Sequence, residues 1–283
     1  MKPFRWDIAR REQLGRLLDG PPAPDYPEYL DDLVETGARV VEASGDGDLV
    51  FVGRSVEGLY DFFRGLFRGT AWAQRLIHFN VSLRWRSTAE ATARRAAFAR
   101  HLEAVGLGPA DIARRARSVA LVDVVSDGIT MGELIRLVLA SARVGGVDAN
   151  AVRRRLRVVA ITWRGTPSPK AYRWWQRRDW TKALKPAAIR GVSADGRLWA
   201  FLGNNEDKVA AWNPPDRWDV PREVSSPSQV SALRLARRVY EAGLTRAWRE
   251  RFAARLAATP GMKEAWVRAL VGALRRTSRP GVV

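Results

Sequence analysis

One stretch of the sequence, residues 118–130, limits the fold more than any other. It begins with an apolar, β-branched run that ends at Asp123, continues as a short polar turn with Gly128 and Thr130, and leads directly into a helical pattern. A continuous apolar run of this kind is typical of a strand buried in a parallel sheet. The turn at the carboxyl end of such a strand is where open α/β sheets bind ligands, and the N-terminus of the following helix favours an anion.

Two further apolar runs, residues 49–52 and 156–163, have the same character, and residues 76–83 also read as a strand. Helical patterns at residues 59–67, 88–105, 109–117 and 132–143 lie between these strands. Alternation of strands and helices predicts right-handed crossovers and a parallel sheet. We therefore expect an α/β core over residues 46–163, preceded by an N-terminal helical segment over residues 1–45.

The remainder of the chain differs in composition. Residues 164–221 are rich in Pro, Trp and Gly and contain short strand candidates at 188–192 and 198–202, which predicts an irregular aromatic lid or edge subdomain. Residues 222–283 read as a basic helical block, with helices at about 229–242, 246–258 and 262–276.

The composition excludes several kinds of chemistry. The chain has no cysteine, so disulfides, thiolate metal sites and cysteine nucleophiles are excluded, and two histidines, His78 and His101, make a His-rich metal centre unexpected. No apolar run approaches the roughly 18 residues that a bilayer span needs, and the first residues lack the apolar core of a signal peptide. We expect a cytoplasmic protein without a membrane partner.

The net charge of +18 requires a separate explanation, and about half of the excess lies after residue 222. Such a field attracts polyanions, so nucleic acid is one candidate partner. Solvated arginine-rich helix faces are the alternative and explain most of the charge. A homodimer also stays open.

The turn after Asp123 contains two local signals. Thr130 and Glu133 have the spacing of a capping box, in which the threonine hydroxyl and the glutamate satisfy free N–H groups at a helix start. Asp123 is a carboxylate at the end of a buried strand, where a charge is costly unless it is paired or binds a cation. This second signal favours a functional role over a purely structural one.

The residues from Asp123 to Thr130 resemble the signature of the type I phosphoribosyltransferases. In that signature two acidic residues, two apolar residues, two small polar residues, Gly, any residue and Thr follow an apolar strand, and this chain matches from the second acid onward. The resemblance implies a phosphoribosyltransferase-like fold that binds 5-phosphoribosyl pyrophosphate (PRPP) and Mg²⁺. It implies an enzyme that transfers the 5-phosphoribosyl group to a small, nitrogenous acceptor and releases pyrophosphate.

The same resemblance assigns roles to individual residues. Asp123 would contact the ribose and the metal, and the turn would hold the 5-phosphate through Ser126, Asp127, Gly128, Ile129 and Thr130. The first acid of the signature is replaced by Val122, which removes one ribose contact. Asp127 lies one residue beyond the position where some members carry a catalytic carboxylate. It is either a general base or a turn residue that accepts a local hydrogen bond.

A second loop upstream, residues 53–58, resembles the pyrophosphate loop of the family. Gly53 allows close backbone approach, and Arg54 supplies a forked cation for phosphate oxygens. Ser55 would join them, unless it only caps the next helix. The family also has a basic loop that closes over the reacting centre, and the corresponding interval contains Arg84, Arg86, Arg94 and Arg95.

The acceptor side is expected after the strand at 156–163, at Trp163 and Arg164. The aromatic residues that follow could stack a planar base or form a hydrophobic cluster: Tyr172, Trp174, Trp175 and Trp180. Two other functions stay open. One is a non-catalytic PRPP-sensing regulator that binds nucleic acid through its basic surface, and the other is a basic helical scaffold with a vestigial Rossmann-like core.

Overall fold

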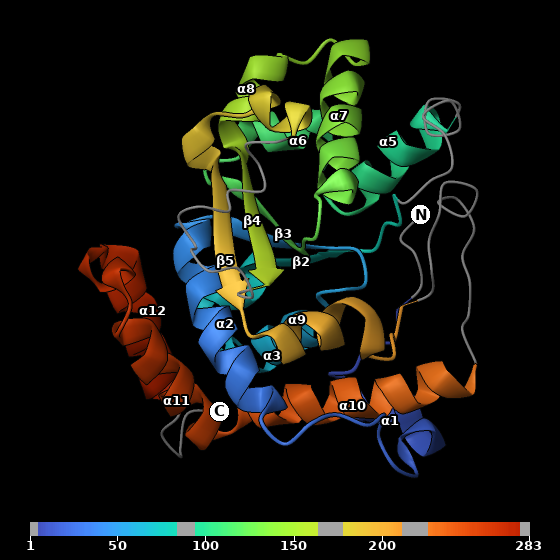
Figure 1. The fold of residues 1–283 in the computed structure, drawn as a ribbon, viewed down its shortest axis with the longest axis vertical. Helices are drawn as coiled ribbons and strands as arrows, with labels where there is room; N and C mark the ends of the chain where they lie inside the picture. Colours follow the sequence, from blue (N-terminus) through green and yellow to red (C-terminus); the bar gives the residue numbers. More distant parts are fainter. Residues whose placement is uncertain (1–4, 84–93, 164–177, 211–225, 278–283) are drawn as a thin grey trace.

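The computed structural model describes residues 5–83, 94–163, 178–210 and 226–277. The chain folds around a five-stranded, all-parallel sheet with the order β2-β1-β3-β4-β5 (Figure 1). The strands are β1 (Asp48–Val52), β2 (Leu76–Phe79), β3 (Val119–Val124), β4 (Leu156–Trp163) and β5 (Ile189–Ala194). The predicted α/β class and parallel sheet are confirmed.

Helices cover both faces of this sheet, which explains the continuous apolar runs. Phe51, Val122 and Ile161 face α2 (Tyr29–Ser44) and α3 (Glu57–Leu66). Their neighbours Val50 and Leu121 face the opposite layer. That layer consists of α5 (Arg95–Ala104), α6 (Pro109–Arg114), α7 (Ile129–Val144) and α8 (Ala149–Arg155).

The C-terminal helices form a second layer outside α2 and α3. They are α10 (Pro227–Leu244), α11 (Arg246–Ala257) and α12 (Ala265–Thr277); α10 packs on α3, and α11 packs on α2 and α12 (Figure 1). Helices α3 and α10 approach so closely that a Cβ at Gly65 would lie 2.1 Å from the Tyr240 carbonyl oxygen. Val239, Phe252 and Leu270 belong to the same core cluster as the sheet residues. The basic C-terminal block is thus part of the main core.

Short elements complete the described chain. These are α1 (Arg11–Leu14), η1 (Gly15–Leu18), η2 (Ala71–Arg75), η4 (Asp179–Ala183), η5 (Pro186–Ala188), α9 (Gly196–Ala200), η6 (Phe201–Asn205) and η8 (Pro260–Lys263). Within the described ranges, no helix has both the length and the apolarity needed to cross a bilayer.

Several predicted elements need correction. The strand candidate at 198–202 is wrong: Asp195 caps α9 by accepting the Arg197 N–H at 2.8 Å, and a π-helical turn, η6, follows. Here Phe201 packs edge-on against the ring of Tyr29, so ring packing favours the helical turn over a strand. Strand β5 pairs with β4 and extends the core sheet, so the expected boundary at residue 163 does not separate it from the core. Strand β2 ends at Phe79, and the part of the 88–105 helix before residue 94 lies outside the described residues.

Candidate functional site

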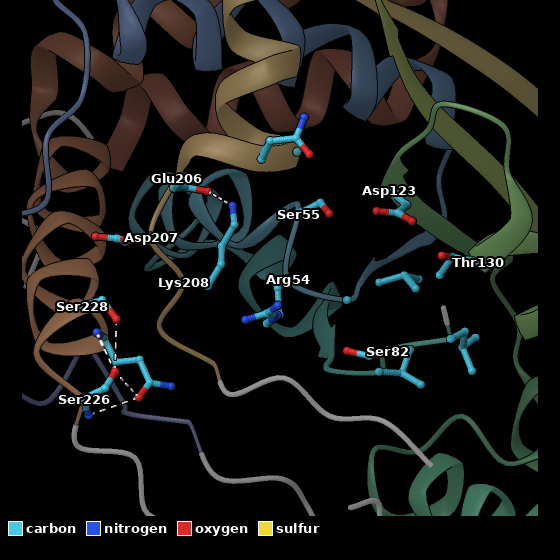
Figure 2. Close-up of a pocket in the computed structure, with 17 residues that line it drawn as sticks. Arg54, Ser55, Ser82, Asp123, Thr130, Glu206, Asp207, Lys208, Ser226 and Ser228 are labelled. Carbon is cyan, nitrogen blue, oxygen red and sulfur yellow. Dashed lines mark hydrogen bonds and ion pairs between the residues drawn. The ribbon is translucent and has the colours of Figure 1, made fainter. Parts of the chain in front are cut away.

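A cavity of about 550 Å³ lies at the carboxyl ends of β1 and β3. In this strand order the chain leaves β1 toward β2 on one side and continues with β3 on the other, so the loops after β1 and β3 diverge. Open α/β sheets bind ligands at such a switch point. Residues from both predicted loops line the cavity: Gly53, Arg54, Ser55, Asp123 and Thr130 (Figure 2).

The loop after β1 is fixed by its backbone. Gly53 has a φ of +72°, its N–H donates to the Phe79 carbonyl at 2.9 Å, and its own carbonyl accepts the Nε2–H of His78 at 2.9 Å. Burial lowers the pKa of His78 to about 3, so its imidazole stays neutral and serves as a donor. A Cβ at position 53 would combine a strained φ with a 3.2 Å approach to the Val81 carbonyl oxygen. Only glycine holds this loop without strain.

Arg54 and Ser55 come next and line the cavity (Figure 2). Helix α3 begins at Glu57 with Val56 at its N-cap and no side-chain cap, so Ser55 is not the cap of α3. In the described part of the chain no carboxylate forms an ion pair with Arg54, and burial lowers the pKa of its guanidinium. The cavity therefore contains a guanidinium without an ion-pair partner among the described residues, although the Glu57 carboxylate stabilises its charge.

Asp123 provides a buried carboxyl group on the β3 side. Its side chain is 6 % exposed, and one carboxylate oxygen accepts the Val124 N–H at 2.8 Å. Burial raises the pKa of Asp123 to about 8, against smaller lowering effects from that hydrogen bond and from Lys208. A carboxyl group buried in this way becomes charged more readily when a hydrogen-bond donor or a cation is bound beside it.

The turn after β3 differs from the prediction in its details. Gly128, with a φ of +76°, is the N-cap of α7, so Thr130 lies within the helix. Glu133 pairs with Arg136, and the expected capping box of Thr130 and Glu133 is wrong. The reason is that the left-handed glycine starts the helix two residues earlier than the threonine would.

Only one residue of this turn lines the cavity, namely Thr130. Asp127 accepts the Ile129 N–H at 3.1 Å. It therefore forms the local turn contact that the sequence offered as the alternative to a general base. Ser126 is exposed, and Ile129 is 51 % exposed. The arrangement thus places Asp123 and Thr130 at the cavity and leaves Ser126, Asp127, Gly128 and Ile129 outside its lining.

The far wall of the cavity comes from a segment that the sequence did not single out, residues 203–208. Lys208 donates to the Leu202 carbonyl at 2.8 Å and forms an ion pair with Glu206. The Tyr29 hydroxyl donates to the other oxygen of Glu206 at 2.7 Å, and burial raises the pKa of this carboxyl. Lys208 is thereby held at the cavity with its ammonium group partly neutralised. Gly203, Asn204 and Asp207 complete this wall. Three residues at the start of α10 line the cavity next to it: Ser226, Ser228 and Gln229.

Glu57 ties this wall to the loop after β1. Its carboxylate accepts the N–H groups of Val209 at 2.9 Å and of Ala210 at 3.1 Å. A Cβ at Gly58 would lie 2.1 Å from the Tyr29 hydroxyl oxygen and 2.5 Å from Glu206, so glycine is required here. These contacts join residues distant in sequence, so no local pattern could indicate them; the only traces are Gly58 and the charged run from Glu206 to Lys208.

Those of the expected acceptor and closing residues that the structure describes lie away from the cavity. Trp163 is 57 % exposed, does not line the cavity, and packs its indole over Gly196. The indole of Trp180 packs against Gly132, so it takes part in a hydrophobic contact rather than in stacking a planar base. Arg94 and Arg95 are at the start of α5, away from the cavity lining. The others fall outside the described residues: Arg84, Arg86, Arg164, Tyr172, Trp174 and Trp175.

The described residues contain no group of three or more His, Asp or Glu side chains that could hold a metal ion. Mg²⁺ is usually bound through one or two carboxylates together with the phosphates of a ligand, rather than by a cage of protein groups. The buried Asp123 carboxyl, with its raised pKa, fits that partial role. The donor set fits Mg²⁺ only when an anionic ligand supplies the remaining oxygens.

No protein-family model, curated protein or solved structure matches this chain.

Proposed function

We propose that this chain binds PRPP in the cavity between the β1 and β3 loops and transfers its 5-phosphoribosyl group to a small, nitrogenous acceptor. Pyrophosphate is released in the transfer. One observation carries this proposal: the two loops that resemble the pyrophosphate and ribose-phosphate loops of the phosphoribosyltransferases line a single cavity at the switch point of the sheet. A cavity of about 550 Å³ is large enough for a sugar phosphate.

The groups at the cavity match the parts of this ligand. Arg54 offers a guanidinium fork for pyrophosphate oxygens, and the hydroxyl of Thr130, in the first turn of α7, can donate to the 5-phosphate. Asp123 can accept hydrogen bonds from the ribose hydroxyls. The chain thus holds and orients two anionic groups around one sugar ring.

Asp123 would hold Mg²⁺, which would supply positive charge for the leaving pyrophosphate. The protein contributes position and electrostatics, and the reaction needs no covalent nucleophile. This fits a cavity whose lining residues include no cysteine and no histidine.

Isothermal titration of the full chain with PRPP and Mg²⁺ tests the binding step. We expect saturable binding that weakens at least tenfold in Asp123→Asn and in Arg54→Gln, because each loses a charge-assisted contact of about 1.5–3 kcal/mol. Glu103→Gln, an exposed carboxylate on α5, is the matched control and should bind as the wild type does. Absence of binding by the wild type, or unchanged binding in Asp123→Asn, would overturn the proposal.

The transfer step is tested separately by pyrophosphate release from PRPP across a panel of nitrogenous bases. One observation favours a second function, a PRPP-sensing regulator without turnover. Val122, which replaces the first acid of the signature, is fully buried in the core that faces α2 and α3, so the site has one carboxylate where the signature has two. PRPP binding without pyrophosphate release, together with nucleic-acid affinity that falls by several log units per log unit of salt, would identify the regulator.

A further inference from the structure

A second groove, of about 570 Å³, runs along the outer edge of the sheet at β5. Four successive residues of β5 line it: Arg190, Gly191, Val192 and Ser193. The groove lies on the α2 face of the sheet, where residues of α2 and Arg157 of β4 also line it, and the four successive β5 residues show that it extends to the edge of the sheet. Strand β5 is the last strand of the sheet, so in the described part of the chain its outward N–H and C=O groups have no neighbouring strand.

The groove has a cationic wall. Arg39, Arg157, Arg190 and Lys263 line it, against two carboxylates, Glu42 and Glu264, so cations are in excess. Other surface arginines of this chain are paired with acids across elements, as in the pairs Arg251–Asp31, Arg255–Glu35 and Arg238–Asp25. In contrast, Arg157, Arg190 and Lys263 form no ion pair within the described residues. Arg39 is paired with Glu35, so three of the four cations of this groove have no ion-pair partner among the described residues.

These cations share one face of the sheet. Arg190 alternates with Ile189 and shares its face with Val192, which packs toward α2. The wall opposite is η8, which is joined to α2 because the Glu42 carboxylate accepts the Gly261 N–H at 2.6 Å. A strand lying beside β5 would thus present every second side chain to this cationic face.

We propose that this groove binds an extended acidic segment of a partner protein, which pairs with β5 as a sixth strand. Acidic residues at alternate positions would face the cationic wall, and the intervening positions would lie over Gly191 and Ser193. The peptide backbone would satisfy the free edge of β5, a recurring mode of peptide recognition. Single-stranded nucleic acid fits less well, because no aromatic side chain among the described residues lines the groove to stack bases.

Fluorescence anisotropy with the full chain and a labelled eight-residue peptide, in which Glu alternates with Val or Thr, tests this proposal. We expect saturable binding, and binding at least tenfold weaker for a peptide of the same composition with its Glu residues contiguous. Methylation of alternate backbone nitrogens should have a similar effect, because it removes the ladder hydrogen bonds.

The double variant Arg190→Gln/Lys263→Gln should bind the alternating peptide about tenfold more weakly, since two partly exposed charge pairs are lost. Arg275→Gln/Arg276→Gln removes the same charge from the exposed end of α12 and should leave binding unchanged. Hydrogen exchange provides a second readout without any variant: those amides of residues 190–193 that point away from β4 should become protected when the peptide is added.

Two results would overturn the proposal. One is equal binding of the N-methylated or contiguous peptide, which would show unspecific charge attraction. The other is displacement of the peptide by single-stranded DNA at equal or lower concentration, which would make nucleic acid the occupant. PRPP affinity should not change with the peptide bound, because the two grooves have no lining residue in common.

Discussion

Asp123 couples the candidate site to the pH dependence of stability. Its pKa is about 8 in the folded chain and near 3.8 when unfolded, so between these values the folded state binds more protons than the unfolded state. The free energy of unfolding should therefore fall as the pH rises from about 4 to 8. In Asp123→Asn this contribution is absent, so between pH 5 and 9 the free energy of unfolding of the variant should rise relative to that of the wild type by on the order of 4 kcal/mol. Urea unfolding at both pH values measures the difference, and an equal difference at the two would contradict the assignment.

Gly58 tests the packing behind the cavity. Gly58→Ala would drive a methyl group into the Tyr29 hydroxyl and Glu206, and overpacking of this kind typically lowers the free energy of unfolding by about 1–3 kcal/mol. Adding Tyr29→Phe removes the nearest atom, so the double variant should be less destabilised than the sum of the two single variants. Gly272→Ala in α12 is the control, because only the flexible Arg276 side chain is near its Cβ position. Additive effects in the Gly58 and Tyr29 cycle would show that the two residues do not interact.

At the scale of elements, Glu57 holds residues 209–210, which directly follow the cavity wall of residues 203–208, against the start of α3. Glu57→Gln replaces one of the acceptor oxygens with an amide group, so either the Val209 or the Ala210 N–H loses its charged partner, at about 1–3 kcal/mol. We expect faster hydrogen exchange at these two amides, with the amides of β3 unchanged. Glu103→Gln should leave both regions unchanged. If the amides of Val209 and Ala210 were as well protected in Glu57→Gln as in the wild type, Glu57 would not be what holds this segment.

The elements that could be predicted are those with a strong local signal. The apolar runs of β1, β3 and β4 indicated buried strands because helices cover both of their faces, and Gly53 and Gly128 fell at turns that need a positive φ. Residues 198–202 were misread because a short apolar run does not distinguish a strand from a buried helical turn. Lys208 was missed because its place at the cavity depends on Glu206 and on Tyr29, which is far away in sequence. The two loops of the candidate site could therefore be predicted from local sequence patterns, and the wall opposite them, residues 203–208, could not.

At the scale of the whole molecule, the C-terminal helices carry much of the positive charge and also a large part of the core. Arg249 illustrates how the two are combined. It is 5 % exposed and donates to the carbonyls of Gly65, in the last turn of α3, at 3.0 Å and of Arg68, just beyond that helix, at 2.9 Å. A basic residue in this block thus serves the fold rather than a polyanion. Basic composition alone is for this reason weak evidence for nucleic-acid binding by this chain.

This organisation predicts that residues 1–225 do not fold alone. Removing α10, α11 and α12 would expose the faces of α2 and α3 now covered by Val239, Phe252 and Leu270, each of which contributes about 1.5–3 kcal/mol when buried. The loss of several such side chains is comparable to the roughly 5–15 kcal/mol by which folded proteins are stable. We expect the truncated chain to lack a cooperative urea transition by circular dichroism, while Arg249→Met in the full chain keeps one at a lower midpoint. A cooperative transition in the truncated chain would instead make the C-terminal helices a dispensable appendage, and the basic charge on them would again need a partner to explain it.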